Sequence, residues 1–160
     1  MSSLKKGYAC TLTLIIVGMV FFYKSFYFDF FNIDDLIQTG ENLAVLNFDL
    51  KGLLFKFYLG LYYPLSTLSF AIDWWLGGSQ PWLFHLNNFI FHLLASLILL
   101  KVCLKLWPEK FLVGFLISLT FLLHPLKAES VAWISERKDV LSGLFLWLTC
   151  LVADSNFGSI

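Results

Sequence analysis

The sequence is poor in charged residues and lacks the patterns of a nucleic-acid-binding or metal-binding protein. Only 14% of its 160 residues are charged, against about 25% in soluble domains. Its 11 basic and 11 acidic residues cancel, which excludes the basic surface that nucleic-acid binding needs. The three cysteines lie far apart, without a CxxC or a Cys/His spacing. The cysteines are therefore expected to be small apolar fillers, with neither a disulfide framework nor a Cys/His metal site.

Apolar and aromatic residues take the place of charge. Hydrophobic residues make up 59% of the chain and aromatic residues 19%, and the mean hydropathy is +0.78, which is typical of a membrane protein. The first apolar run follows Lys5 and Lys6 and has no small-x-small cleavage site, so we expect it to remain as a signal anchor. Transmembrane helices are predicted at about residues 7–27, 81–101, 110–125 and 139–154.

The segment 42–78 allows two interpretations. It is rich in Tyr and Trp, and Gly60 and Pro64 interrupt its longest uncharged run. The aromatic residues favour helices that lie at the membrane interface. The alternative is a broken transmembrane helix, which would reverse the sidedness of all that follows. We expect the interfacial arrangement, and hence an all-α, polytopic membrane helix bundle formed by residues 1–160 as one domain, with about four transmembrane helices and interfacial helices in the first external loop.

Acidic residues gather on one side of the membrane in this topology. All of them except Glu109 and Asp154 fall in the two loops that are expected outside. Counting basic residues does not settle the orientation, because lysines and arginines are divided almost evenly between the two sides. The acidic residues therefore indicate that polar chemistry is concentrated on the external face.

Two polar clusters lie in these external loops. Asp34 and Asp35 follow the first apolar run, and six charged residues lie between His124 and Val140. Ionisable residues held at a membrane edge indicate a functional site. The six are Lys127, Glu129, Glu136, Arg137, Lys138 and Asp139.

Four motifs resemble a known family of membrane enzymes. The DFFNIDD run at 29–35 resembles the first external loop of type C (GT-C) glycosyltransferases, in the branch that bears tetratricopeptide repeats and is related to protein O-mannosyltransferases. The YPLS run at 63–66 with Asp73, and the HLNN run at 85–88 with His92, resemble its next two motifs. The stretch 124–139 resembles its second external loop. The resemblance covers about residues 29–150.

This resemblance implies transfer of a sugar from a polyprenyl-phosphate carrier to an acceptor hydroxyl. An inverting transfer needs a carboxylate that accepts the proton of the attacking hydroxyl, and Asp34 or Asp35 is the catalytic candidate. The alternative for this pair is a turn that ends a helix. Glu129 is a second catalytic candidate, which could orient the acceptor or a divalent metal, or could pair with Lys127 or Arg137.

The same resemblance implies residues that bind the substrate. Arg137 and Lys138 suit a lipid phosphate, or they anchor the fourth span at the interface. On one short helix, Glu136 would share a face with Glu129 and Trp133.

A polar stripe runs along the second long apolar run. His85, Asn88 and His92 are spaced at i, i+3 and i+7, so they share one helix face. Such groups usually hydrogen-bond to neighbouring helices; the alternative is that the stripe, with His85, lines a groove for a lipid phosphate. His124, before Pro125, is expected to end the third span and to contribute to the substrate site.

The family's members are longer and have more spans. We therefore expect an N-terminal fragment of an integral-membrane glycosyltransferase, completed by a missing C-terminal portion or a partner subunit. The alternative is a small non-catalytic membrane protein, either a remnant or a subunit. The expected partners are membrane lipid and a polyprenyl-phosphate-sugar donor. Lysine-rich turns fit a bacterial inner membrane or an endoplasmic reticulum membrane equally, and the resemblance favours the bacterial one.

Overall fold

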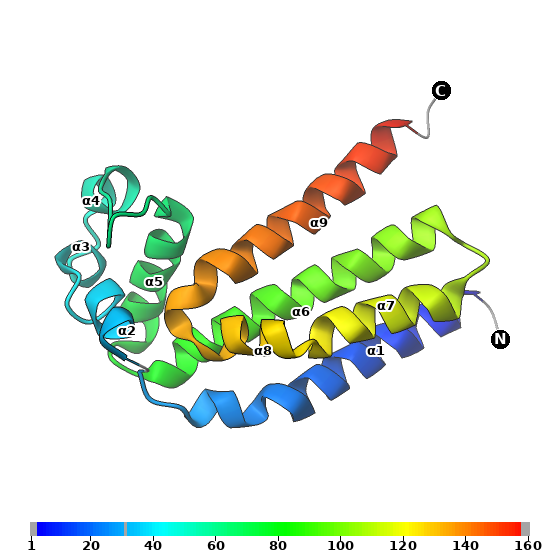
Figure 1. The fold of residues 1–160 in the computed structure, drawn as a ribbon, viewed down its shortest axis with the longest axis horizontal. Coiled ribbons are helices and arrows are strands. Elements are labelled where there is room, and N and C mark those ends of the chain that lie inside the picture. Colours follow the sequence, from blue (N-terminus) through cyan, green and yellow to red (C-terminus); the bar gives the residue numbers. More distant parts are fainter. Residues whose placement is uncertain (1–2, 31, 158–160) are drawn as a thin grey trace.

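Long helices lying side by side form the body of the molecule. The computed structural model describes residues 3–30 and 32–157, where every regular element is a helix. Helices α1 (Ser3–Phe22), α6 (Pro81–Leu106) and α7 (Phe111–Leu123) pack against one another, and η1 (Tyr23–Tyr27) extends α1 (Figure 1). Helix α9 (Arg137–Phe157) packs on α6, and the far ends of the two helices diverge in the view of Figure 1.

Shorter helices of the first loop gather at one end of this body. They are α2 (Asn32–Gln38), α3 (Leu43–Leu46), α4 (Leu50–Phe55) and α5 (Pro64–Gly77) (Figure 1). Side-chain caps start two of them, because the Asn42 oxygen accepts from the Ala44 amide and the Asp49 carboxylate from the Lys51 amide. Helix α5 starts on a proline and ends at Gly77, and the next residue, Gly78, has a φ of +60° that suits a residue without a side chain.

The second loop returns to the same end of the bundle. It consists of α8 (Pro125–Ala132) and η2 (Ile134–Glu136), which lead into α9 (Figure 1). Helix α7 ends at Leu123 and bends by 50° into α8. The prediction that His124 and Pro125 end the third apolar helix is confirmed.

Two hydrophobic clusters hold the helices together. One joins the long helices and includes Leu14, Phe89 and Leu122. The other joins the first-loop helices to α6 and η2 and includes Phe70 and Phe84. The first-loop helices are thus packed on the start of α6 and do not form a separate unit.

Two helices, α1 with η1 and α6, are long and apolar enough to cross a membrane. A third span exists if the bent pair α7 and α8 counts as one. This makes the chain an integral membrane protein, but the predicted number of four spans is not confirmed within the described residues. Helix α9 has the length of a span, yet Arg137, Lys138 and Asp139 occupy its first turn and Asp154 lies near its end. Helix α6 runs to Leu106, so the turn predicted over 101–110 is shorter than expected.

A buried ion pair ties α5 to α9. One guanidinium nitrogen of Arg137 lies 2.5 Å from the Asp73 carboxylate, and both side chains are almost fully buried. Burial raises the pKa of the Asp73 carboxyl, and the nearby Arg137 guanidinium and Asn87 amide oppose that rise. The Arg137 guanidinium also lies 4.4 Å from the centroid of the Phe70 ring, a distance that permits a cation–π contact.

We predict that Arg137→Leu destabilises the protein by about 3–5 kcal/mol, because it leaves the Asp73 carboxylate buried without its counter-charge. Chemical denaturation in detergent micelles, followed by circular dichroism, measures the free energy of unfolding. The double variant Asp73→Leu/Arg137→Leu should recover much of the loss, since it removes both charges. A single variant as stable as the wild type would contradict this account.

Candidate functional site

The two charged loops meet, and Asp35 joins them. Its carboxylate is fully buried and accepts from the Ser135 backbone amide at 2.8 Å and from the Ser135 hydroxyl. A hydroxyl and an amide from the second loop thus bind a carboxylate from the first loop, a hundred residues away. The two acidic clusters of the sequence therefore form one region at the end of the bundle.

Asp34 differs from its neighbour because it is half-exposed. Its charge acts on Tyr63, at the start of α5. Burial raises the pKa of the Tyr63 hydroxyl, and the Asp34 carboxylate raises it further. This hydroxyl therefore remains protonated at neutral pH, and it is buried without a hydrogen-bond partner among the described residues.

A groove of about 480 Å³ lies between the start of α5 and the first turns of α9. Its polar lining includes Tyr62, Tyr63, Ser66, Lys138 and Ser142. The Tyr63 hydroxyl is an unused hydrogen-bond donor beside this groove. The groove combines donors with one cation, which is the chemistry that recognises an anion.

Lys138 supplies that cation. Its ammonium lies 2.8 Å from the Glu136 carboxylate, and both side chains remain partly exposed. Because such a partly exposed pair contributes little to stability, the Lys138 ammonium can also bind the anionic group of a ligand. Glu136 therefore orients Lys138 at the edge of the groove.

Apolar side chains continue from the groove along α9. Leu141 and Phe145 line the groove together with the polar residues. Phe145 also lines the next hollow, of about 400 Å³, together with Leu148 and Val152. A polar head and an apolar track are thus arranged along one helix.

Arg137 does not lie in this groove. Its side chain is fully buried and donates to Asn88 at 2.6 Å, to Ser69 at 3.1 Å and to the Phe84 carbonyl at 2.8 Å, besides pairing with Asp73. Every nitrogen of its guanidinium is used within the protein. The expectation that Arg137 contacts a lipid phosphate is therefore not supported by this structure.

Glu129 lies on another side of the same region. It is exposed and lines a small hollow of about 210 Å³ with Phe28 and Trp133. His85 is fully buried close by, and its ring centroid lies 6.2 Å from that of Phe28. Neither nitrogen of the His85 ring meets the geometry of a hydrogen bond with another described residue. The structure brings these two candidates to one area, separate from the lining of the α5–α9 groove.

Helix α8 ends at Ala132, so the predicted common helix face of Glu129, Trp133 and Glu136 does not form. Trp133 adopts an extended conformation between α8 and η2. Glu136 consequently turns to Lys138 and away from Glu129. The reason is a contact with another helix, because Asn88 of α6 donates to the Trp133 carbonyl at 3.1 Å and thereby holds the chain at the break.

The remaining polar stripe binds neighbouring elements. Asn88 joins α6 to Trp133 and Arg137, and His92 Nε2 lies 3.1 Å from the Leu122 carbonyl oxygen of α7. These contacts confirm helix–helix bonding for both residues. His124 is exposed, and its Nδ1 accepts from the Leu126 amide at 3.3 Å, so it caps α8. Nothing in the structure brings His124 into the groove.

Within residues 3–30 and 32–157, no group of three or more His, Cys, Asp or Glu side chains is arranged to hold a metal ion. Glu129 has no second carboxylate in the lining of its hollow.

Sequence reasoning missed Ser142 and the roles of Tyr63, Ser66 and Asp73. Asp73 carried a usable signal, since it is the one charged residue between Lys56 and Lys101. A lone acid in so long an uncharged stretch implies a buried partner elsewhere in the chain. No comparable signal identifies the two serines, because their place in the groove depends on how α5 meets α9.

We predict that Ser135→Ala lowers the free energy of unfolding by about 1.5–3 kcal/mol, because the buried Asp35 carboxylate loses a hydrogen bond that its charge strengthens. Thermal unfolding in micelles measures the change. The matched control is Ser142→Ala, since Ser142 is exposed and bonds only the Lys138 carbonyl of its own helix. Equal effects of the two substitutions would argue against a connection between the loops through Asp35.

Comparison with known proteins identifies animal relatives of part of the chain. The protein O-mannosyl-transferase TMTC1 of Mus musculus is 39% identical over 90 residues, which is 56% of this chain and 10% of that protein. The protein O-mannosyl-transferase TMTC3 of Homo sapiens is 38% identical over 84 residues, which is 52% of this chain and 9% of that protein. The protein O-mannosyl-transferase tmtc2 of Xenopus laevis is 37% identical over 90 residues, or 56% and 11%. The chain thus spans about a tenth of the length of these relatives.

The resemblance to protein O-mannosyltransferases that the four motifs predict is therefore confirmed over about half of the chain. No protein-family model matches the chain, and no solved structure matches it significantly. The relatives are eukaryotic and give no support to the expected bacterial inner membrane.

Proposed function

We propose, from this relationship to protein O-mannosyl-transferases, that the chain forms part of a membrane glycosyltransferase of the GT-C type. The groove between α5 and α9 would hold the phosphate of a polyprenyl-phosphate sugar donor. The observation that carries the proposal is the groove itself, in which one cation and several hydroxyl groups lie at the head of an apolar track. An amphiphilic donor needs both parts in that order.

The donor phosphate would bind at the polar end. The Lys138 ammonium supplies charge, and the hydroxyls of Ser66 and Ser142 supply hydrogen bonds. The polyprenyl tail would follow Leu141 and Phe145 along α9 toward the membrane interior. Burial of apolar surface against these side chains favours the lipid-linked donor over a soluble sugar phosphate.

Asp34 is the proposed catalytic base. The acceptor hydroxyl oxygen attacks the anomeric carbon, the bond from that carbon to the phosphate oxygen breaks, and polyprenyl phosphate leaves. The hydroxyl proton passes to the base. Asp34 suits this role because it is half-exposed and acts electrostatically on Tyr63 beside the groove. Asp35 is buried and bound to Ser135, so its proposed part is to position the loop that carries Asp34.

Glu129 is proposed to bind the acceptor, and the buried His85 to support Phe28 in the wall of the same hollow. The hollow beside Glu129 is lined by aromatic residues and lies in the second loop, outside the donor groove. An exposed carboxylate there accepts a hydrogen bond from an acceptor hydroxyl in this proposal. The topology in this proposal has four spans, with α9 as the fourth and α2–α5 at the interface, and it gives both acidic loops to the external face.

We predict that Lys138→Gln weakens binding of polyprenyl phosphate about tenfold, since one charge-assisted hydrogen bond contributes about 1.5 kcal/mol. Binding is measured by native mass spectrometry of the purified chain in detergent. The control is Lys56→Gln, because Lys56 is exposed in the first loop and does not line the groove. Equal loss of binding in both variants would indicate general electrostatic attraction and would contradict binding of the donor in the groove.

We predict that Asp34→Asn reduces sugar transfer by about 10²–10⁴-fold, the usual contribution of a general base, while donor binding stays unchanged. The assay follows transfer of labelled mannose from polyprenyl-phosphate mannose to a serine- and threonine-containing protein by the chain in liposomes. Glu41→Gln removes an exposed carboxylate of the same loop and serves as the control. A wild-type chain that binds the donor but transfers no sugar would contradict catalysis by these residues and would favour the non-catalytic alternative.

A further inference from the structure

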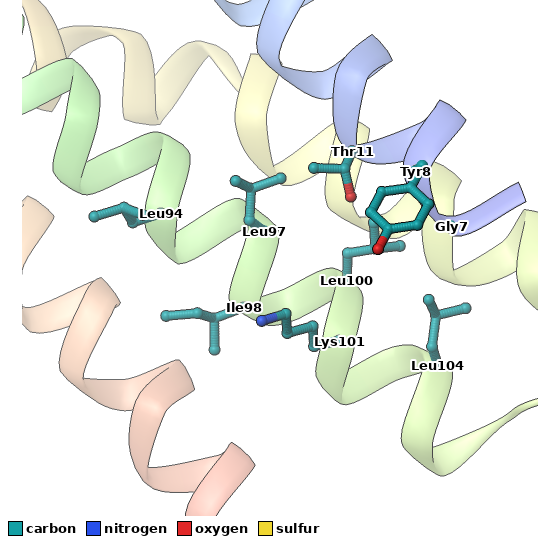
Figure 2. A pocket seen from close by; sticks show the side chains of 9 residues that line it. All are labelled: Gly7, Tyr8, Thr11, Leu94, Leu97, Ile98, Leu100, Lys101 and Leu104. Carbon is teal, nitrogen blue, oxygen red and sulfur yellow. The ribbon is translucent and has the colours of Figure 1, made fainter. Parts of the chain in front are cut away.

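A second groove lies at the opposite end of the long helices. It has a volume of about 430 Å³ and is formed by the first turns of α1 and the last turns of α6. Figure 2 shows Lys101 among the leucines of α6, with Tyr8 and Thr11 of α1 on the other side. This groove is remote from the residues of the proposed donor site and has no part in that reaction. Its lining is Gly7, Tyr8, Thr11, Leu94, Leu97, Ile98, Leu100, Lys101 and Leu104.

The groove contains a cation that the described residues leave without a counter-charge. Lys101 is exposed, and no hydrogen bond or ion pair joins it to another described residue. Five of its eight neighbours in the groove are leucine or isoleucine, and Tyr8 and Thr11 of α1 contribute hydroxyl groups. An ammonium so placed favours an occupant that is apolar along most of its length and negatively charged at one end.

The depth of Lys101 matches a lipid headgroup. Helix α6 has 26 residues, or about 39 Å at 1.5 Å per residue, and exceeds a hydrocarbon core of about 30 Å. If the helix is centred, Lys101 starts roughly 3 Å inside the hydrocarbon, and its side chain is long enough to reach the headgroups. The aliphatic residues Leu94 and Leu97 then lie deeper, where an acyl chain would run.

Charge at this end of the bundle favours an anion. Lys101, Lys105 and Lys110 lie within ten residues, against one acid, Glu109. Negatively charged lipid surfaces attract lysines near the membrane in this way. A packed protein helix would fit less well, because it would need an acidic residue placed opposite Lys101 inside the membrane.

We propose that this groove binds one anionic glycerophospholipid, with an acyl chain against Leu94 and Leu97 and the phosphate at the Lys101 ammonium and the Tyr8 hydroxyl. The site would hold α1 and α6 together at the end of the bundle that lies opposite the charged loops. This proposal is independent of the proposed transfer reaction, because it involves none of the residues of the donor groove.

Native mass spectrometry of the purified chain, titrated with dioleoyl phosphatidylserine or dioleoyl phosphatidylcholine, tests the proposal. We expect one phosphatidylserine to bind several-fold more tightly than phosphatidylcholine. Lys101→Gln should weaken that binding about fivefold, the effect of one lysine near an anionic lipid surface. Lys105→Gln is the matched control, since Lys105 lies one helical turn further on and does not line the groove; it should change binding less than twofold.

A second pair of variants tests the shape of the groove with the charge kept. A side chain added at Gly7 meets no atom within 4 Å, and the same holds for Gly143 on α9. Gly7→Leu should therefore fill the groove and reduce binding of the lipid, whereas Gly143→Leu should not. Circular dichroism of each variant checks that the helices remain.

Four results would overturn the proposal. Equal affinities for the two phospholipids, or equal effects of Lys101→Gln and Lys105→Gln, would mean that no specific lipid site exists. Binding of polyprenyl phosphate that exceeds that of phosphatidylserine and is lost in Lys101→Gln would assign the groove to the lipid carrier. A wild-type dimer that dissociates in Gly7→Leu would assign it to a second copy of the chain.

Discussion

The buried Asp73–Arg137 pair is the interaction on which the arrangement of the charged end depends. Arg137 begins α9, Asp73 lies in α5, and the remaining guanidinium contacts reach Asn88 and the Phe84 carbonyl of α6. Three helices are thus fixed by one side chain, which is fully buried. A buried charge without its partner is unfavourable by several kcal/mol. Movement of α5 away from α9 is therefore strongly disfavoured. The same ion pair therefore fixes the positions of the two helices that form the groove.

A second polar contact, between Asp35 and Ser135, gives the adjacent residues Asp34 and Asp35 different roles. Asp35 is buried and binds the second loop through Ser135, while Asp34 remains half-exposed near Tyr63. One carboxylate therefore positions the loop, and the other is accessible to a substrate. Similarly, Arg137 acts inside the protein while its neighbour Lys138 reaches the groove. In each pair, consecutive residues point in different directions from the backbone and so serve different purposes.

The positions of the hydrophobic helices, apart from the end of α6 at Leu106, could be predicted from the sequence, whereas the contacts between loops could not. The span at 7–27 and the end of α7 at His124 follow from apolar runs and proline, and both agree with the structure. The pairing of Arg137 with Asp73 depends on how α5 crosses α9, for which no local pattern exists. The family resemblance implied a phosphate ligand for Arg137 and Lys138 alike, because both are cations near a membrane edge. The packing of Phe70 and Phe84 around Arg137 shows that Arg137 lies inside the protein, unlike Lys138.

The central claim is that the α5–α9 groove receives the head of a polyprenyl-phosphate donor at the end of the bundle where both charged loops meet. The most direct measurement is photocrosslinking with a polyprenyl phosphate that carries a photoreactive group in its first isoprene unit, followed by peptide mapping of the adduct. Adducts are expected within residues 62–66 and 138–145, the two segments that supply the lining of the groove. Adducts confined to α1 and the last turns of α6 would contradict this claim, because the carrier would then bind at the opposite end of the molecule.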